Sequence, residues 1–390
     1  MGCKEIVLVD SLRTPIGKVD GALSSLLAPE LGAPIIEEMI RRYPIIRDNT
    51  ENIIIGNSVS AGVGQNPARQ TALLGGMCPG SNAFTVNQVC GSGMSVVGLS
   101  RAMMIDQDTR LAIAGAVESC SNTPLLLDRK NIKEGREMIL VDSLHQDGLN
   151  CAIEDVPMGD MAEEYALLHS ISREEQDDFA YESHDKALSA RKSGIFDDEI
   201  IGIDIKGGNR CVSDENIRVK CMRERLSRLQ PVYRKEGSIT AGNSSGLGDC
   251  ASLVLLAEVG FAKSNNLKPL VRILDSCVMG TPLKSVFSGG AQVFEKLLKR
   301  NGLTVKEIDI FEICESFACT ALGFLKETGV SREKINPYGG DIALGHPMGA
   351  SGSRLLTTLT HAMVREDKKR GIAIMSMGGG HSMGILLEKY

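Results

Sequence analysis

The sequence predicts an α/β protein in which buried, partly parallel sheets are covered by helices. β-branched runs alternate with helical patterns over most of the 390 residues, and this alternation is typical of layered α/β folds. Hydrophobic residues make up 43% of the chain, which is enough for a sizeable core. At about 100–200 residues per domain, the length predicts two or three domains or one large composite fold.

Eight segments carry the pattern of buried strands, and six carry the apolar spacing of helices. The expected strands cover 5–9, 52–57, 110–114, 252–257, 270–276, 309–313, 371–375 and 384–388. The expected helices cover 29–42, 66–75, 93–106, 172–193, 291–301 and 351–365. Ser172 followed by Glu175 forms a capping box, so we expect a long helix to begin there.

The middle of the chain differs from its flanks, because it is more charged and has longer stretches between apolar strands. We interpret residues 122–237 as a segment inserted into the first half that contributes specificity. The N-terminal half is then expected to comprise 1–121 and 238–251, and the C-terminal half 252–390.

Composition and charge exclude several classes of function. The formal net charge of −6 argues against nucleic acid as a partner, because phosphate binding needs a basic surface. No apolar run approaches the roughly 20 residues that span a bilayer, and the strand-like start predicts a cytoplasmic protein without a signal peptide. The 11 cysteines form no CxxC pair, which predicts free thiols and neither a disulfide framework nor a metal site.

Two segments near the ends of the halves resemble each other. CGSGMSVVGLSRAMM precedes the strand-like RLAIAGA, and GHPMGASGSRLLTTLTHAMV precedes GIAIMSMGG. Two similar halves that face each other would place Cys90 and His346 on opposite walls of one cleft. Chance similarity between two βαβ units is the alternative.

Cys90 lies between a strand-like segment and a Gly-rich helix start. The positive end of a helix dipole stabilises a thiolate, and backbone N–H groups next to glycines can bind an oxyanion. Simple packing of a buried cysteine explains the motif equally well.

His346 lies between Gly and Pro on a strand-to-helix turn, where a rigid imidazole can accept a thiol proton. A loop histidine bonded to backbone is the alternative.

Gly378 begins a run of three glycines that can present N–H groups to a thioester oxygen, or form only a hairpin turn. Cys314 ends a strand and is expected near both Cys90 and His346, with its thiol partly ionised by the imidazole. Glu315 beside it is explained by helix capping.

Several ordered motifs together resemble the thiolase family, and the similarity runs from residue 4 to 390. They are RTPIG, GQNPARQ, VNQVCGSGM, AGNSSGLGDCAS and GGDIALGHPMGASG, with a cap segment that begins at MGDMAEEY. The resemblance implies the thiolase fold, with two βαβαβ halves related by a pseudo-twofold axis and a loop (cap) domain inserted in the first. It also implies a homodimer or homotetramer.

The resemblance implies roles for individual residues. Cys90 would become an acyl thioester, His346 would activate it and line one oxyanion hole, and the N–H groups of Cys90 and Gly378 would form a second hole. The positions that match the family's pantetheine tunnel are Met158, Ser245 and Phe317, and Arg218 matches a basic residue near the nucleotide of coenzyme A. Acyl-CoA and coenzyme A are therefore the expected substrates, with no tightly bound cofactor.

Two departures from the family concern the chemistry directly. The family's CxG motif is Ser376-Met377-Gly378 here, and a hydroxyl is too weak an acid to replace a thiol near neutral pH. The family's NEAF motif begins with Cys314 in place of Asn. We hypothesise that Cys314 has taken over the acid/base role. The alternative is that Cys314 is inert and condensation is lost.

The leading prediction is an acyltransferase that condenses two acyl-CoA units, such as acetyl-CoA to acetoacetyl-CoA, or catalyses the reverse thiolysis. One alternative is an acyltransferase or unusual condensing enzyme of secondary metabolism that keeps only the acylation of Cys90. Another is a non-catalytic scaffold that binds coenzyme A, although a scaffold has no need of both Cys90 and His346.

Overall fold

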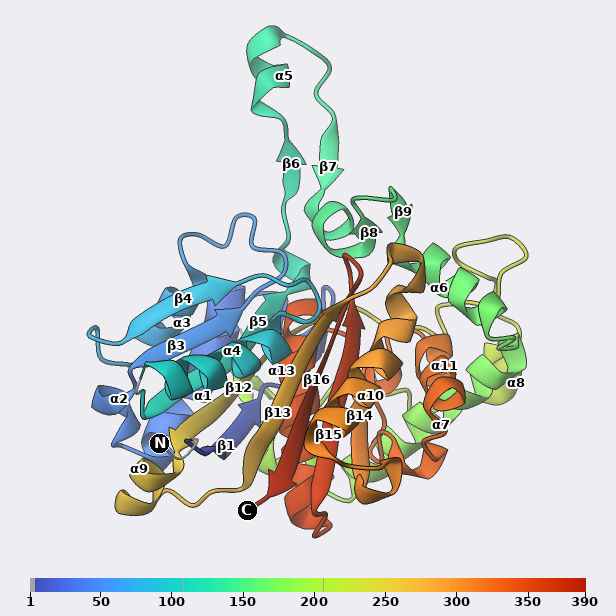
Figure 1. Cartoon of the computed structure of the whole chain (residues 1–390). Coiled ribbons are helices and arrows are strands. Elements are labelled where there is room, and N and C mark those ends of the chain that lie inside the picture. The colour runs from blue at the N-terminus through green and yellow to red at the C-terminus, as the bar shows by residue number, and fades with distance from the viewer. Residues whose placement is uncertain (1–3, 108, 206) are drawn as a thin grey trace.

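The computed structural model describes residues 4–107, 109–205 and 207–390. Its core is a sheet whose strands follow the order β14-β15-β16-β13-β1-β12-β5-β3-β4, with β2 paired to β12 (Figure 1). These strands are β1 (Ile6–Arg13), β2 (Gly17–Lys18), β3 (Asn52–Gly56), β4 (Asn82–Val86), β5 (Leu111–Ser119), β12 (Gly248–Glu258), β13 (Val271–Gly280), β14 (Ile310–Ile313), β15 (Arg370–Met377) and β16 (His381–Lys389). Only two residue pairs, Val7–Arg272 and Leu8–Val271, join β1 to β13, so the sheet consists of two halves.

The two halves repeat one strand pattern, as the sequence repeat predicts. β3 pairs parallel with β5, and β14 pairs parallel with β15. β5 is antiparallel to β12, and β15 is antiparallel to β16. The place of β4 is taken in the second half by Ile335, which forms a parallel bridge to Phe311.

Two helices, α4 (Ser92–Asp106) and α13 (Met348–Arg365), pack against each other and against strands of both halves. They cross at glycines, because a Cβ on Gly93 would lie 2.9 Å from the Gly349 carbonyl oxygen, and one on Gly352 would lie 2.7 Å from Met94. The glycines that follow Cys90 and His346 therefore permit close helix contact. Residues of both helices belong to the central hydrophobic core.

The outer faces carry further helices. α1 (Ala28–Arg42) and α3 (Pro67–Leu74) cover the N-terminal half, and α10 (Gly289–Asn301) and α11 (Ala318–Thr328) pack with the C-terminal half. Short helices α2 (Ile46–Asn49), α9 (Val259–Ser264) and α12 (Asp341–Leu344) complete the two halves. Among the described residues, no helix has both the length and the apolar character needed to cross a bilayer.

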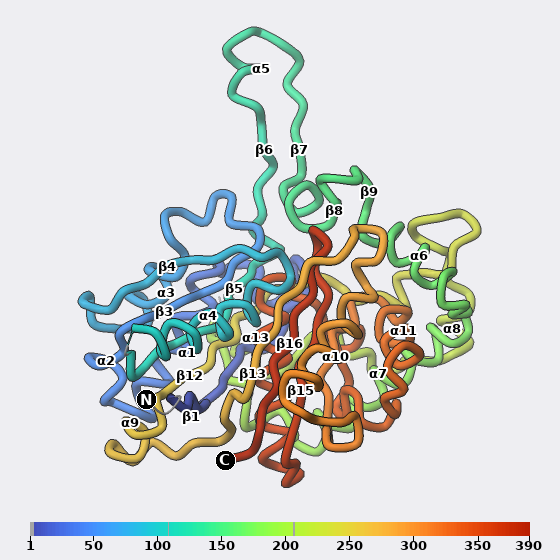
Figure 2. The backbone as a smooth tube through the Cα atoms, in the orientation of Figure 1, coloured from blue at the N-terminus to red at the C-terminus, as the bar shows by residue number. Residues whose placement is uncertain are grey.

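The segment 122–237 is built differently from the halves. It contains β6 (Leu125–Leu127), α5 (Arg129–Glu134), β7 (Leu140–Asp142), β8 (Asn150–Cys151), β9 (Val156–Pro157), α6 (Met158–Leu168), α7 (Arg173–Lys192), β10 (Ile203–Ile205), β11 (Asn209–Cys211) and α8 (Arg223–Leu226). The part from β6 through α5 to β7 projects from the body as a stalk, while α6 and α7 pack beside α11 (Figures 1 and 2).

All eight expected strands and six expected helices are present, with ends that differ by a few residues. The capping box at Ser172 and Glu175 is formed in both directions. The expected boundary between residues 251 and 252 falls inside β12, however, which pairs with β5 from Asp249 to Ala257. By strand pairing, the N-terminal half thus continues to Glu258.

A buried ion network ties α13 to its surroundings. The Arg354 guanidinium contacts Glu312 of β14 at 3.1 Å and Asp341 of α12 at 2.8 Å, and all three side chains are fully buried. Burial opposes ionisation of Asp341, yet Arg354 and His346 hold its pKa below the usual range. A buried carboxylate of this kind depends on its cationic partner.

We predict that Arg354→Leu lowers the free energy of unfolding by about 3–5 kcal/mol, because the variant leaves buried carboxylates without a cation. Urea unfolding measures the change. Arg365→Leu on the same helix is the control, since Arg365 pairs with the exposed Asp198 and should cost less than about 1 kcal/mol. Equal effects of the two substitutions would contradict a structural role for the network.

Candidate active site

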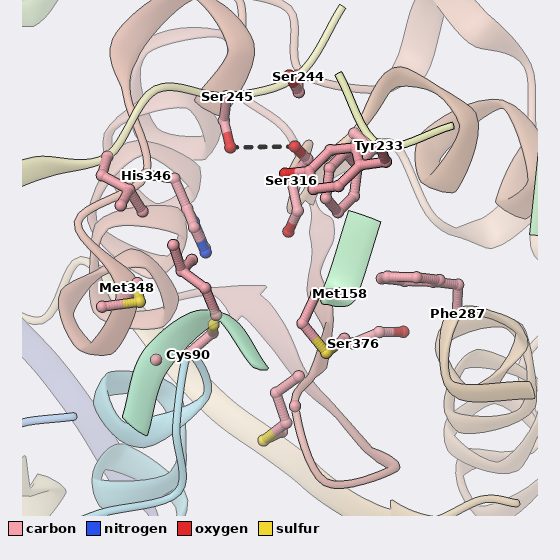
Figure 3. A pocket seen from close by; sticks show the side chains of 16 residues that line it. Cys90, Met158, Tyr233, Ser244, Ser245, Phe287, Ser316, His346, Met348 and Ser376 are labelled. Carbon is pink, nitrogen blue, oxygen red and sulfur yellow. Dashed lines mark hydrogen bonds between the residues drawn. The ribbon is translucent and has the colours of Figure 1, made fainter. Parts of the chain in front are cut away.

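A cavity of about 210 Å³ lies where both halves meet the inserted segment. Cys90, His346 and Ser376 line it from the starts of α4 and α13 and from β15 (Figure 3). The full lining is Cys90, Gly148, Leu149, Met158, Tyr233, Ser244, Ser245, Leu247, Phe287, Ser316, Phe317, His346, Met348, Ser376, Met377 and Gly378. The structure therefore brings together the cysteine and histidine that the sequence singles out.

A tight turn before α4 presents Cys90. The Ser92 hydroxyl donates to the Val89 carbonyl at 2.6 Å and accepts from the Gln88 N–H at 2.8 Å. Val89 has a φ of 49°, a left-handed conformation that is unusual for a β-branched residue and typical of functional sites. The turn places the Cys90 sulfur at the cavity wall.

His346 is held by its Nδ1 atom. This nitrogen lies 2.8 Å from the Ser351 hydroxyl and 3.9 Å from both Asp341 Oδ1 and Cys314 Sγ. Figure 3 shows the ring above Cys90 with a nitrogen directed into the cavity. With Nδ1 engaged on the buried side, Nε2 is the nitrogen available to Cys90 and substrate.

Two opposing effects set the pKa of His346. Burial lowers it, but the nearby Cys314 and Cys90 sulfurs and the Asp341 carboxylate raise it, and the net direction is upward. An imidazolium formed by proton transfer from Cys90 would therefore be stabilised where it forms.

Cys314, Asp341 and His346 could in principle ligate a metal, since one donor atom of each lies within 4.8 Å of the others. Asp341 Oδ1, however, accepts a hydrogen bond from the Arg354 cation at 2.8 Å, and His346 Nδ1 is bonded to Ser351. A second cation at Oδ1 would be repelled by Arg354. We therefore interpret the three residues as an ion network and not as a metal centre.

Cys314 lies near His346, but it is not among the residues that line the 210 Å³ cavity. It lines a smaller cavity of about 20 Å³, which shares Phe287, Ser316 and Ser376 with the larger one. Burial and Asp341 raise the pKa of the Cys314 thiol, and this outweighs the opposite effect of His346. The expected partial ionisation is thus opposed by burial, and the protonated thiol is the favoured form.

Ser376, which the resemblance places at the CxG cysteine of the thiolase family, lines both cavities. Its Oγ accepts a hydrogen bond of 2.9 Å from the Ser382 hydroxyl. Next in the chain, Met377 and Gly378 also line the larger cavity. Gly378 approaches the Cys90 turn closely, because a Cβ on it would lie 3.2 Å from Val89.

The glycine run also forms the turn between β15 and β16, where Gly379 and Gly380 have φ values of 79° and 74°. The hairpin interpretation of this run is therefore confirmed. Gly378 lines the cavity in addition, so the two interpretations are compatible.

The three residues expected along the pantetheine tunnel all line the larger cavity: Met158, Ser245 and Phe317. The Phe317 ring lies 6.0 Å, centroid to centroid, from both Tyr233 and Phe287 in edge-on contacts. These side chains form an apolar wall opposite Cys90, which suits a flexible thioester arm.

Arg218 lies outside this cavity. It lines an adjoining cavity of about 280 Å³ with Lys18 and Asn216, and the two cavities share Ser244 and Ser245. Its Nη2 donates to the Ala241 carbonyl at 2.9 Å. Two cations beside the tunnel residues are compatible with a site for phosphate groups.

Sequence reasoning missed residues that act through distant partners. The imidazole of His346 contacts Ser351 and Asp341, and Arg354 pairs with Asp341. The sequence hint of this network is an Asp and an Arg within the otherwise small and apolar segment DIALGHPMGASGSRLL. Ser316, whose Oγ lies 3.2 Å from Cys314 Sγ, was likewise missed.

Comparisons with known proteins agree with this geometry. Residues 6–260 match the thiolase N-terminal domain and residues 267–389 match the thiolase C-terminal domain. A "probable acetyl-CoA acyltransferase" of Staphylococcus epidermidis is 38% identical over 393 residues, and one of Staphylococcus aureus strain COL is 39% identical over 399 residues. Each alignment covers 99% of both chains.

A crystal structure of an acetyl-CoA acetyltransferase from Bacillus anthracis superposes with a TM-score of 0.96 at 32% identity, over 100% of this chain and 99% of that one. The chain belongs to the thiolase family. It is an acyltransferase of that family.

His184 supports the backbone of Arg218. Its Nδ1 accepts the Arg218 N–H at 3.3 Å, and its buried Nε2 has no hydrogen-bond partner among the described residues. Burial and the Arg218 charge lower the pKa of His184 to about 4. The folded state therefore favours the neutral imidazole.

We predict that this histidine makes the protein less stable in mild acid. The stability that neutral His184 provides is fully present above its unfolded pKa near 6.5 and is lost as pH falls toward 4. The loss amounts to roughly 3 kcal/mol. The free energy of unfolding of wild type and His184→Asn, measured by urea at pH 7 and pH 4.5, tests this. Between pH 7 and pH 4.5, wild type should lose more free energy of unfolding than His184→Asn. An equal loss in the two proteins would show that His184 is not the group responsible.

Proposed function

We propose that the chain is a coenzyme A-dependent thiolase that forms an acyl thioester on Cys90. It cleaves a 3-ketoacyl-CoA with coenzyme A or catalyses the reverse Claisen condensation, with acetyl-CoA and acetoacetyl-CoA as the default substrates. The observation that carries this proposal is the placement of Cys90 and His346 on one cavity with an apolar wall of Met158, Phe287 and Phe317.

The acylation step follows from the contacts of His346. A proton on Nδ1 donated to Ser351 leaves the Nε2 lone pair free to accept the Cys90 thiol proton. The thiolate then attacks the substrate carbonyl. The backbone N–H groups of Cys90 and Gly378 would bind the resulting oxyanion. The close approach of Gly378 to Val89 in the Cys90 turn supports this assignment.

The second half of the chemistry needs an acid for the carbon that leaves as an enolate. Ser376 is too weak an acid for this, and His346 is used at Cys90. Cys314 is a protonated thiol beside the imidazole. We assign the acid role in thiolysis to Cys314, which by microscopic reversibility is the base in condensation.

One alternative has specific structural support. Because Cys314 does not line the larger cavity, an enzyme that only acylates Cys90 and passes the acyl group to another acceptor would show the same geometry. The scaffold alternative is disfavoured, since it does not explain why Cys90 and His346 meet in one cavity.

The expected homodimer or homotetramer stays a prediction with some support. β4 is the sheet's edge strand, is only half-buried, and lies next to the Cys90 turn. The stalk exposes apolar side chains, namely Leu125, Ile132, Met138, Ile139, Leu140 and Val141. Exposed apolar groups on projecting segments are typical of interaction surfaces. The cytoplasmic location, and the absence of nucleic-acid, membrane, cofactor and metal partners, also stay predictions.

Cys90→Ala should abolish the mass increase that acetyl-CoA produces in the intact protein, because Cys90 is the thiol that lines the cavity beside His346. Intact-protein mass spectrometry measures the adduct. Cys78→Ala, at a half-exposed thiol outside the cavity, is the control and should label like wild type. Persistent labelling of Cys90→Ala would disprove the assignment.

His346→Ala should slow acylation by acetyl-CoA by about 10²–10⁴-fold, the usual effect of losing a positioned base. Rapid-quench mass spectrometry gives the rate. His361→Ala is the control, since that ring bonds the Ser11 carbonyl away from the cavity. An acylation rate equal to wild type would leave His346 with a structural role only.

Cys314→Ala should still acylate Cys90 but lose thiolysis of acetoacetyl-CoA by about 10²-fold or more, because the acid for the leaving carbon is gone. Steady-state thiolysis and the acylation assay are run on the same preparation. Cys319→Ala, at another buried thiol five residues along, is the control. Undiminished thiolysis would exclude Cys314 from the chemistry.

A further inference from the structure

Three side chains, Phe287, Ser316 and Ser376, lie between the smaller cavity at Cys314 and the larger cavity, and Ser316 is the one that contacts the Cys314 sulfur. Ser316 lines both the larger and the smaller cavity, whereas Cys314 lines only the smaller one. The Ser316 Oγ atom lies 3.2 Å from the Cys314 sulfur. Through this contact, a proton of the Cys314 thiol can reach the larger cavity at the Ser316 hydroxyl.

The backbone of Ser316 is fixed on its other side. Its carbonyl oxygen accepts hydrogen bonds from the Ser245 N–H at 3.0 Å and from the Ser245 hydroxyl at 3.1 Å (Figure 3). These bonds leave the Ser316 hydroxyl free for the thiol and the cavity. Fixed geometry of this kind is what proton transfer at a reacting carbon needs.

We propose that Ser316 is a catalytic relay, which passes the Cys314 proton to carbon C2 of the acyl-CoA enolate released during thiolysis. This inference rests on the proposed thiolase function and extends it to a residue that touches substrate. It also explains how a thiol outside the substrate cavity acts on a carbon inside it.

The protons balance within these side chains. Cys90 gives its thiol proton to His346 Nε2 as its sulfur bonds to C3 of the 3-ketoacyl-CoA. The bond between C2 and C3 then breaks, and its electron pair stays on C2 as an enolate. The Ser316 hydroxyl proton moves to C2 while the Cys314 proton moves to Ser316. The Cys314 thiolate then stays paired with the imidazolium, whose Nδ1 lies 3.9 Å away. When coenzyme A removes the acyl group, its thiol proton goes to Cys314 and the imidazolium returns the Nε2 proton to the departing Cys90 sulfur.

Ser376, the other serine that lines both cavities, does not offer this route. Ser376 Oγ accepts from the Ser382 hydroxyl, which also lies 3.5 Å from the Val286 carbonyl. Among the described residues, the hydrogen-bond partners of Ser376 and Ser382 include no thiol and no imidazole. A hydroxyl relays a proton only when an acid of suitable pKa replaces that proton. Of the two serines that line both cavities, Ser316 is the one with such an acid, Cys314, among its contacts in the described part of the chain.

The test compares Ser316→Ala with wild type in D₂O. Exchange of the methyl hydrogens of acetyl-CoA, followed by mass spectrometry, reports proton transfer at C2 without requiring turnover. We expect exchange and thiolysis of acetoacetyl-CoA to fall by about 10²-fold or more, while acylation of Cys90 stays at the wild-type rate. Retained acylation also shows that the variant is folded.

Two further variants separate a relay from a packing role. Ser316→Thr keeps a hydroxyl and should retain most of the exchange. Thr320→Val removes a different hydroxyl from the smaller cavity, one that donates to the Phe317 carbonyl at 2.8 Å, and should match wild type. A loss in Thr320→Val as large as that in Ser316→Ala would overturn the relay.

A double variant tests whether Cys314 and Ser316 act as one unit. If they do, Cys314→Ala combined with Ser316→Ala loses no more exchange than either alone. Independent losses that multiply, or full exchange in Ser316→Ala, would overturn the relay. If wild type acylates Cys90 but shows neither hydrogen exchange nor thiolysis, both the relay and the proposed cleavage of the carbon–carbon bond are overturned. If wild type never acylates Cys90, the proposed function itself is refuted.

Discussion

The contact between Arg354 and Asp341 fixes the surroundings of His346, the proposed base. Arg354 lies in the middle of a helix buried along almost its whole length, and its guanidinium keeps Asp341 ionised there. Asp341 in turn lies 3.9 Å from His346 Nδ1 and accepts the backbone N–H of Glu315, next to Cys314. One ion pair thus lies beside both the imidazole of His346 and the strand end that carries Cys314.

A second buried carboxylate joins this region to the other half. Glu118 of β5 accepts the backbone N–H groups of Ser58 and Gly349, each at 2.9 Å. Ser58 also donates through its hydroxyl to the Val89 carbonyl in the Cys90 turn. Because a buried carboxylate needs several donors, the strand of one half fixes the histidine loop of the other. The relative position of Cys90 and His346 therefore depends on the packing of the two halves.

Compared with the CxG and NEAF motifs of the thiolase family, this chain lacks a thiol on β15, at Ser376, and has one after β14, at Cys314. Ser376 faces the substrate cavity but has only another hydroxyl behind it. Cys314 has the imidazole beside it but lies behind Ser316. The acidic thiol and the hydroxyl on the larger cavity thus belong to different residues, and in the proposed relay the hydroxyl of Ser316 connects the Cys314 thiol to substrate.

The sequence predicts the α/β layers and the elements well, because apolar periodicity and capping are local. It also predicts that Cys90 and His346 share a cavity, through the repeat of the halves. The limits of β12 were misplaced, because Gly248 and Asp249 look like a turn although both are buried in the sheet.

Contacts across long separations were out of reach of sequence reasoning. Arg354 contacts Glu312, which lies 42 residues earlier in the chain. The small cavity beside Cys314 is formed by the packing of α11 and β15. The role of Ser316 likewise depends on which cavities its hydroxyl borders, and no local pattern encodes that.

The central claim is that this chain breaks a carbon–carbon bond without the CxG cysteine of its family. A single-turnover experiment with acetoacetyl-CoA and no free coenzyme A tests it most directly, with acetylated Cys90 and released acetyl-CoA counted together. The account predicts one acetyl-CoA released for each Cys90 acetylated. Acetylation of Cys90 by acetyl-CoA, with acetoacetyl-CoA left uncleaved, would contradict it.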